Sequence, residues 1–235
     1  VWCMTTALVA FVTAFLVGTA VTWAMRRVAP RLGAVDRPDG YRKIHTRVIP
    51  YLGGVGVFFG FVTPIVLLLS AFNHILPSRS LMENHGLLLS MVAGAGVALS
   101  MGAWDDIRGM RPRVKLLWQT VAALVAMSGG HVIWCLSLPF VGDVELGFLG
   151  VPLTLFWFLG CMNAINLLDG MDGLAGGVSL IVSITMMVVG RVLGNVPGMV
   201  LMACLSGGIL GFLVHNFHPA RIFLGDSGSN VIGFL

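Results

Sequence analysis

Residues Asn163 to Gly177 read Asn-Ala-Ile-Asn-Leu-Leu-Asp-Gly-Met-Asp-Gly-Leu-Ala-Gly-Gly and lie between two apolar runs, each long enough to cross a bilayer. Residues three apart on a helix share a face, so this spacing predicts one polar stripe of four side chains: Asn163, Asn166, Asp169 and Asp172. Gly170 and Gly173 interrupt the stripe, which indicates a helix end or a close approach of the backbone to a ligand. Such a stripe at a membrane boundary suits a cation or a sugar nucleotide, and a solvated loop with Asp-Gly turns is the alternative.

The composition is that of a membrane protein. Hydrophobic residues make up 57% of the 235 residues, charged residues make up only 10%, and the mean hydropathy is +0.94. These values lie outside the range of soluble proteins. The formal net charge is +4, but the charges cluster by loop, so they indicate membrane topology and not nucleic-acid binding. We therefore expect an all-α, polytopic integral membrane bundle with no nucleic-acid partner.

Seven apolar runs have about the length of a membrane span, at 4–25, 52–72, 86–104, 114–130, 150–168, 174–193 and 197–214. An eighth run begins near Ser229, so we expect one transmembrane domain over residues 1–235 with about seven complete spans. Pairs of glycines four residues apart, Gly56 with Gly60 and Gly207 with Gly211, predict close helix packing in lipid. The segment 135–148 alternates weakly around Gly142-Asp143, which predicts a short external β-hairpin.

The loops divide by charge. Counting the crossings assigns 26–50, 105–113, 166–173 and 215–228 to one side of the membrane, and 73–85, 131–149 and 194–196 to the other. Of the 14 Lys and Arg residues, all except Arg79 and Arg191 lie on the first side or at its edge. The positive-inside rule makes that side cytoplasmic. Most of the acids lie there too, so we expect the site at this face.

Two further motifs carry carboxylates at the same face. Asp105 and Asp106 lie at the end of the third apolar run. A carboxylate at the bilayer centre costs roughly 2.5–3.5 kcal/mol of insertion free energy, so we expect this pair at the membrane interface or directed toward the bundle interior. Adjacent carboxylates repel, so one takes a proton or a cation holds both ionised; a solvated helix end paired with Arg108 is the alternative. Asp226 lies in Gly-Asp-Ser-Gly, whose open backbone suits a divalent cation that bridges phosphates.

Basic side chains accompany the carboxylates. The loop with Lys43 and His45 has the charge to bind a diphosphate, although anchoring of the membrane topology explains the same charge. Lys115 lies just inside the fourth apolar run, where a lysine usually has a partner. Asn216 and His218 precede Asp226, and a structural role is the alternative for the histidine.

Three motifs in register resemble the polyprenyl-phosphate N-acetylhexosamine-1-phosphate transferase superfamily, glycosyltransferase family 4. They are Asp105-Asp106 after an apolar span, Asn163-x-x-Asn166-x-x-Asp169-Gly-Met-Asp172-Gly-Leu, and Phe223-Leu-Gly225-Asp226-Ser-Gly228-Ser. Arg42-Lys43-x-His45 followed by Pro50-x-x-Gly53-Gly54 is similar to the branch that makes undecaprenyl-diphosphate GlcNAc, and less similar to the phospho-MurNAc-pentapeptide transferase branch. The resemblance covers nearly the whole chain.

The resemblance implies transfer of a sugar 1-phosphate from a UDP-amino sugar to a polyprenyl phosphate, with release of UMP and with Mg²⁺, or alternatively Mn²⁺, as cofactor. It implies that Asp105 and Asp106 are catalytic and that Asp226 and Asn166 hold the metal. The substrate-binding residues are then expected to be Asp169, Asp172, Asn216, Lys115, Lys43 and His45. The implied setting is the bacterial inner membrane with a cytoplasmic active site, and homodimer formation stays open.

The sequence departs from the family at its end. Family members carry further spans and a His-rich loop after Gly-Asp-Ser-Gly, whereas this chain stops at Leu235 and starts with Val1. We therefore expect a C-terminally incomplete chain that has little transferase activity by itself. Two rival functions fit the sequence less well. A CDP-alcohol phosphatidyltransferase needs an Ala-Arg after its Asp-Gly, which is missing at 174–177, and a cation transporter places its acids near the bilayer midplane.

Overall fold

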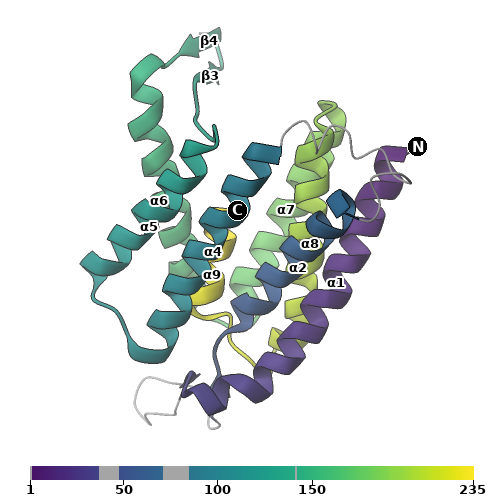
Figure 1. Ribbon diagram of the computed structural model, residues 1–235, viewed down its shortest axis with the longest axis vertical. Coiled ribbons are helices and arrows are strands. Elements are labelled where there is room, and N and C mark those ends of the chain that lie inside the picture. Colours follow the sequence, from purple (N-terminus) through teal and green to yellow (C-terminus); the bar gives the residue numbers. More distant parts are fainter. Residues whose placement is uncertain (1, 37–47, 71–84, 141) are drawn as a thin grey trace.

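The computed structural model describes residues 2–36, 48–70, 85–140 and 142–235. It is a bundle of helices that run between two ends (Figure 1), which confirms the expected all-α class. In chain order the elements are α1 (Trp2–Val28), the 3-10 helix η1 (Ala29–Leu32), β1 (Val35–Asp36), β2 (Ile49–Pro50), α2 (Gly53–Ser70), α4 (His85–Arg108), α5 (Pro112–Ser128), β3 (Cys135–Leu138), β4 (Gly142–Glu145), the 3-10 helix η2 (Gly147–Leu149), α6 (Gly150–Leu168), α7 (Leu174–Val192), α8 (Val196–Asn216) and α9 (Gly225–Phe234).

Within the described residues, six helices are long and apolar enough to cross a membrane: α1 with η1, α2, α4, α6, α7 and α8. The sequence predicted a seventh complete span over 114–130, and this span stays a prediction. The helix in that region, α5, has only 17 residues and carries Arg113 and Lys115 in its first turn. Pro112 at its start and Gly129 after its end limit its length. It nevertheless runs beside the other helices between the two ends (Figure 1).

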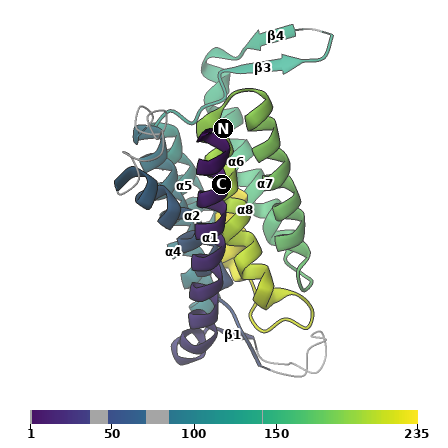
Figure 2. The ribbon, with the colours of Figure 1, turned by 90° about the vertical axis from the view of Figure 1, so that its right-hand side faces the viewer.

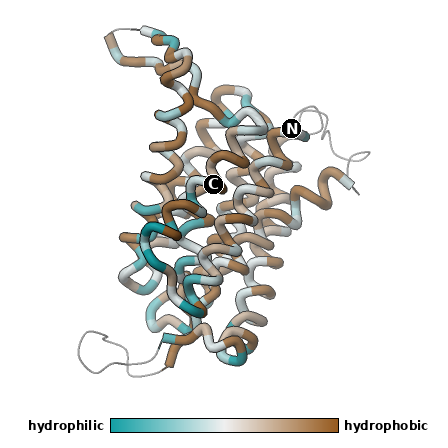
Figure 3. Tube along the Cα trace, turned by 60° about the vertical axis from the view of Figure 1, so that its left-hand side comes forward, coloured by the Kyte–Doolittle hydropathy of each residue, from teal (hydrophilic) through white to brown (hydrophobic). Residues whose placement is uncertain are grey.

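The two ends of the bundle carry the loops that the sequence assigned to opposite sides (Figures 1 and 2). One end carries β1, the α4–α5 and α6–α7 connections and the segment between α8 and α9; we call it the motif end. The opposite end carries the N-terminus, the β3–β4 hairpin and the α7–α8 connection. Hydrophilic residues gather mainly at the motif end and in the hairpin, while the helices between them are largely hydrophobic (Figure 3). The predicted partition is therefore confirmed for the loops that the structure describes; residues 37–47 and 71–84 lie outside the described part of the chain.

The described residues also form two small antiparallel sheets. The predicted hairpin is present as β3 and β4, but Gly142 pairs with Leu138, so the Gly142-Asp143 pair begins the second strand instead of forming the turn. The other sheet was not predicted from the sequence, because two-residue strands leave no alternating pattern. Its strands, β1 and β2, pair Val35 with Pro50 and Asp36 with Ile49, which brings the chain back to the start of α2.

The core is built around α8, which packs against α1, α2 and α7. Glycines allow these backbones to approach: a Cβ added to Gly207 would lie 2.3 Å from the Phe11 carbonyl oxygen, and one added to Gly60 would lie 2.8 Å from the Gly208 Cα. The same interface contains the four-residue glycine pairs predicted from the sequence. Helix packing in lipid depends on such close contact, because lipid tails are as apolar as the side chains.

Candidate active site

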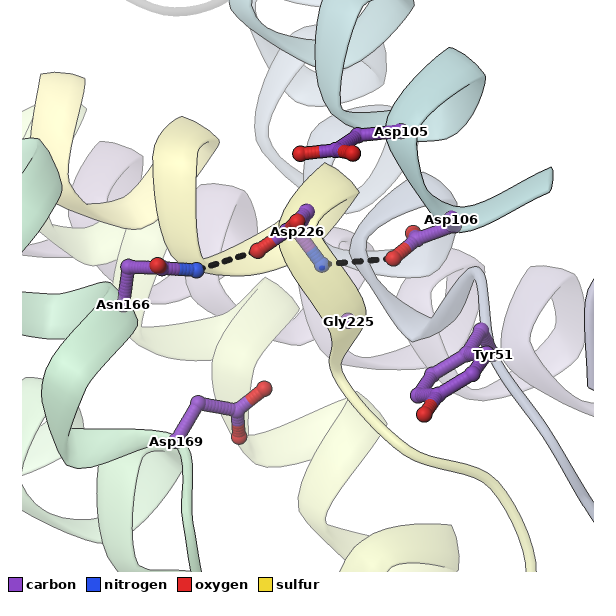
Figure 4. A pocket seen from close by; sticks show the side chains of 7 residues that line it. All are labelled: Tyr51, Asp105, Asp106, Asn166, Asp169, Gly225 and Asp226. Atoms are coloured by element: carbon purple, nitrogen blue, oxygen red, sulfur yellow. Dashed lines mark hydrogen bonds between the residues drawn. The ribbon is translucent and has the colours of Figure 1, made fainter. Parts of the chain in front are cut away.

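An open pocket of ≈ 360 Å³ lies at the motif end, where α4, α6 and α9 meet. Four separate segments line it, and most of the lining side chains are acidic or polar (Figure 4): Asp105 and Asp106 from the last turn of α4, Asn166 and Asp169 at the end of α6, Gly225 and Asp226 at the start of α9, and Tyr51 just before α2. Five of the side chains predicted for the site are thus brought together around one pocket.

The start of α9 is fixed by backbone hydrogen bonds to the segment that precedes α2. The Phe223 N–H donates to the Pro50 carbonyl at 2.8 Å, and the Gly53 N–H donates to the Phe223 carbonyl at 3.0 Å. Gly225 then turns the chain with φ +72°, a conformation that favours glycine. A larger residue would also clash at this position, because a Cβ at Gly225 would lie 2.6 Å from the Asp106 Oδ2 atom.

Asp106 caps α9 from a neighbouring helix. Its Oδ1 atom accepts a hydrogen bond from the Asp226 N–H at 2.7 Å, and its Oδ2 atom accepts one from the Ser227 N–H at 3.1 Å. The first N–H groups of a helix have no partner within the helix, and the positive end of its dipole favours a carboxylate there. Both Asp106 oxygens are therefore engaged by backbone donors that set the direction of the first turn of α9.

Asp226, by contrast, is held by side chains. Its Oδ1 atom accepts a hydrogen bond from the Asn166 Nδ2 group, and its Oδ2 atom lies 2.9 Å from the Lys115 Nζ atom. The same Nζ atom lies 3.2 Å from Asp105 Oδ2. Burial acts to raise the pKa of Asp226, but its interactions with Asp105, Lys115 and Asn166 outweigh burial and hold that pKa below the usual range.

The pKa of Asp169 shows the effect of burying several carboxylates close together. Burial raises its pKa to about 7; the Gly225 N–H opposes this shift, and the charges of Asp106 and Asp226 add to it. Burial, followed by the nearby Asp36 carboxylate, also raises the pKa of Tyr51. Carboxylates crowded in this way are costly to ionise together unless positive charge is added. The pocket is therefore suited to bind a cation.

A chain of carboxamides connects the pocket to the interior of the bundle. Asn163 donates to the Gln119 Oε1 atom at 3.0 Å, and Gln119 donates to the Asn230 Oδ1 atom at 2.8 Å. Asn230 in turn donates to the Asp226 carbonyl at 2.7 Å. Gln119 and Asn230 are fully buried. Three helices, α5, α6 and α9, are thereby linked to the backbone of the residue at the centre of the site.

The predicted polar stripe does not continue past Asn166. α6 ends at Leu168, so Asp169 and Asp172 follow the helix instead of sharing its face, and the helix end expected from Gly170 and Gly173 is confirmed. Asp172 accepts hydrogen bonds from the His218 ring and the Ala220 N–H, both at 3.0 Å. It is not among the residues that line the pocket, because its carboxylate is directed to the segment between α8 and α9.

Asn216 also lies away from the pocket lining. Its amide oxygen accepts from the Gly173 N–H at 3.0 Å, and its amide nitrogen donates to the Ile222 carbonyl at 2.9 Å. Asn216 thus links the α6–α7 connection to the segment between α8 and α9. Substrate binding by Asn216 stays a prediction. Lys43 and His45 lie outside the described residues, so their predicted roles stay predictions as well.

The sequence reasoning missed two kinds of residue. Tyr51 lines the pocket, yet a single tyrosine at an unspecified position of Pro50-x-x-Gly53-Gly54 carries no signal of its own. Asn230 and Ser229 bind Gln119 and Asn166, respectively, from within the start of an apolar run. A buried polar side chain in a membrane helix needs a partner, and Asn230 carries this signal in the sequence just as Lys115 does.

The donor set at Asp226 fits Mg²⁺ when substrate is included. Across residues 2–36, 48–70, 85–140 and 142–235, no three His, Cys, Asp or Glu side chains are arranged to hold one metal ion. Mg²⁺, however, keeps several waters and usually takes one or two protein carboxylates together with substrate phosphates. Asp226 can supply such a carboxylate. Asn166 presents its amide nitrogen to Asp226, so ligation by its oxygen would require the amide to turn over.

Comparison with known proteins adds a family match. The family model described as "Glycosyl transferase family 4" matches residues 88–235. A Bacillus subtilis protein named probable undecaprenyl-phosphate N-acetylglucosaminyl 1-phosphate transferase is 36% identical over 96% of this chain and 60% of its own length.

Two further relatives carry related names. A decaprenyl-phosphate N-acetylglucosaminephosphotransferase from Mycobacterium tuberculosis H37Rv is 37% identical over 95% of this chain and 57% of its own length. A phospho-N-acetylmuramoyl-pentapeptide-transferase from Prochlorococcus marinus is 34% identical over 90% of this chain and 59% of its own length. The chain thus spans less than two thirds of the length of these relatives.

Proposed function

The chain belongs to glycosyl transferase family 4, and on that premise we propose that it transfers N-acetylglucosamine 1-phosphate from UDP-N-acetylglucosamine to undecaprenyl phosphate, with release of UMP. The observation that carries this proposal is the pocket at the motif end, which Asp105, Asp106 and Asp169 line together with Asp226, the ion-pair partner of the Lys115 ammonium group. Such a site suits a reaction between two phosphorylated substrates, in which positioning and charge compensation supply most of the catalysis.

The reaction joins two anions. An oxygen of the lipid phosphate attacks the sugar-bound phosphorus of the UDP-sugar and forms a new phosphorus–oxygen bond. The bond from that phosphorus to the bridging oxygen breaks, and UMP leaves with the oxygen and its electron pair. Phosphoryl transfer of this kind needs in-line positioning and compensation of the negative charge, and little further covalent chemistry from the protein.

The residues divide these tasks. Bound Mg²⁺ would neutralise charge on the diphosphate, and Asp226, with Asn166 beside it, would hold it. Lys115, whose ammonium group ion-pairs with Asp105 and Asp226, can also bind a phosphate oxygen. Asp105 faces the pocket and would accept or orient the acceptor proton, whereas Asp106 directs the first turn of α9 through its two backbone hydrogen bonds.

The motif end is proposed to face the cytoplasm of a bacterium, across its inner membrane. Arg26 and Arg27 in the last turn of α1, Arg108 at the end of α4 and Arg113 at the start of α5 all lie at this end. The bias of Lys and Arg toward one side places that side in the cytoplasm. UDP-sugars are made there, so a pocket at this end would receive the donor directly.

The second candidate is transfer of phospho-MurNAc-pentapeptide, the activity in the name of the relative from Prochlorococcus marinus. A cation transporter is disfavoured, because its acids would lie near the bilayer midplane, whereas these carboxylates lie at helix ends.

The test is release of UMP from a panel of UDP-sugars. Membranes from cells that express a full-length gene product containing this chain would receive undecaprenyl phosphate, Mg²⁺ and either UDP-N-acetylglucosamine or UDP-MurNAc-pentapeptide. We expect lipid-dependent UMP release with UDP-N-acetylglucosamine that stops when EDTA is added. Release with UDP-MurNAc-pentapeptide alone would favour the second candidate, and no release with either donor would contradict the proposal.

A further inference from the structure

We infer that Lys115 is a tethered counter-ion that competes with a divalent cation for the carboxylates of Asp226 and Asp105. The inference rests on the proposed function only in taking Asp226 as a ligand of that cation. Nothing in the sequence distinguishes this role from simple binding of substrate by Lys115; the geometry of its ion pairs does.

The position of Lys115 is the first argument. It lies in the first turn of α5, and its ammonium group contacts carboxylates from two other helices. The distance from Nζ is 2.9 Å to Asp226 Oδ2 and 3.2 Å to Asp105 Oδ2. Its side chain is only 15% exposed, so water screens these ion pairs less than it would at an open surface.

The second argument is that the acceptor atoms of Asp226 are already engaged. Oδ1 accepts from Asn166 and Oδ2 is paired with Lys115. Each oxygen keeps a second lone pair, so a divalent cation that binds this carboxylate would lie directly beside one of these two partners. The Asn166 amide is neutral and does not repel a bound cation, whereas the Lys115 ammonium group repels a second positive charge. Lys115 is therefore the partner that the cation displaces.

The third argument is the excess of negative charge. Asp105, Asp106, Asp169 and Asp226 line one pocket, and crowded carboxylates stay ionised only with compensating charge. The ammonium group supplies part of this compensation within the chain itself. It thereby lowers the affinity of the pocket for a free cation. The phosphates of a bound substrate would add negative charge, so the pocket could then hold both the ammonium group and the cation.

The test measures cation binding in the absence of substrates. Binding of Mn²⁺ alone to the purified protein would be followed by the loss of the free-ion signal in electron paramagnetic resonance. We expect Lys115→Met to bind Mn²⁺ at least about 10-fold more tightly than the wild type, because removal of a nearby like charge favours the cation. Arg113→Met is the matched control: it removes the same charge from an exposed position in the same helical turn and should leave the affinity within about 2-fold.

A second measurement needs no substitution. The chain has two lysines, Lys43 and Lys115, so modification by an amine-reactive reagent can be followed at both by mass spectrometry. If Mn²⁺ displaces Lys115 from the carboxylates, its modification should increase several-fold on addition of Mn²⁺, relative to Lys43 as the internal reference. This result would support the inference even if Lys115→Met failed to fold.

The outcomes separate the inference from the proposed function. Tighter Mn²⁺ binding by Lys115→Met supports the inference even if no variant releases UMP. A folded Lys115→Met protein that binds Mn²⁺ no more tightly than the wild type would overturn it, even if the wild type releases UMP normally. Unchanged modification of Lys115 in the presence of saturating Mn²⁺ would overturn it as well.

Discussion

The helices α8 and α9 are both central to the bundle, but they are held in different ways. α8 lies against α1, α2 and α7, and its glycines touch backbone: added Cβ atoms would lie 2.3 Å from Phe11 O at Gly207 and 2.6 Å from Phe15 O at Gly211. α9 also approaches backbone at Gly228 and Gly233. In addition, its first two turns donate a backbone hydrogen bond to Asp106 and accept side-chain hydrogen bonds from Gln119 and Asn166.

This difference shows what each kind of contact does. Close backbone packing fixes where a helix lies, because a glycine interface leaves no room for displacement. Directional hydrogen bonds fix how the first turn is rotated, and therefore where the Asp226 carboxylate points. Interhelical hydrogen bonds in membranes average only about 0.6 kcal/mol, so those around α9 contribute more to the geometry of the site than to its stability.

The largest expected effect tests the function of α9. Asp226→Asn keeps the shape of the side chain but removes the charge that would hold the cation. We expect UMP release to fall by about 100- to 1000-fold, the size seen when one group that stabilises a transition state is removed. The thermal unfolding temperature in detergent should change little. Near-normal turnover at saturating Mg²⁺ would show that Asp226 does not hold the cation.

The next effect tests the packing of α8. Gly207→Val should destabilise the protein by about 3 kcal/mol or more, because the new side chain would overlap the Phe11 backbone and the helices must separate. Thermal unfolding and gel filtration in detergent would measure the loss. Gly160→Ala on α6 is the control: no atom lies within 4 Å of its added Cβ, so it should be neutral or slightly stabilising.

The smallest expected effect tests whether the chain of carboxamides orients the Asp226 carboxylate in the site. Asn230→Leu removes the bonds to Gln119 and to the Asp226 carbonyl, and we expect UMP release to fall about 10-fold with a stability loss of about 1 kcal/mol. A second substitution, Gln119→Leu, should recover the stability, because no buried amide of this pair is then left unpaired, but it should not recover the turnover.

Ser183→Ala provides the comparison on α8. It removes the buried hydrogen bond between Ser183 and Ser206, which joins α7 to α8 at 2.9 Å. A similar loss of stability with unchanged UMP release would show that hydrogen bonds at α9, and not buried hydrogen bonds in general, orient the site. Equal effects of Asn230→Leu and Ser183→Ala on turnover would remove the distinction between the two helices.

Much of the fold could be predicted from the sequence. The apolar runs correctly located the described helices, and the count of crossings correctly sorted the described loops between the two ends. One failure was local. The turn of the hairpin was expected at Gly142-Asp143, whereas Gly142 already pairs with Leu138.

The sequence indicated which residues could form the candidate site, but it did not indicate how these residues are arranged in space. The spacing of Asp169 and Asp172 predicted one shared face, yet Asp169 lines the pocket and Asp172 binds the segment that follows α8. Helical periodicity could not show this, because the helix ends between Asn166 and Asp169. The residue types alone did not reveal that Asp106 caps α9 while Asp226 is held by side chains.

The sequence by itself determined that the chain forms a membrane bundle, where the helices fall and which end gathers the carboxylates. These properties follow from the length, hydropathy and charge of consecutive residues, which lipid and water sort directly. Only the tertiary structure decided that Lys115 lies between Asp105 and Asp226, and that the Asp106 oxygens bind the backbone of residues about 120 positions later. Such contacts depend on the depth and rotation of helices that are distant in sequence. Close backbone packing fixes the depth, and directional hydrogen bonds fix the rotation.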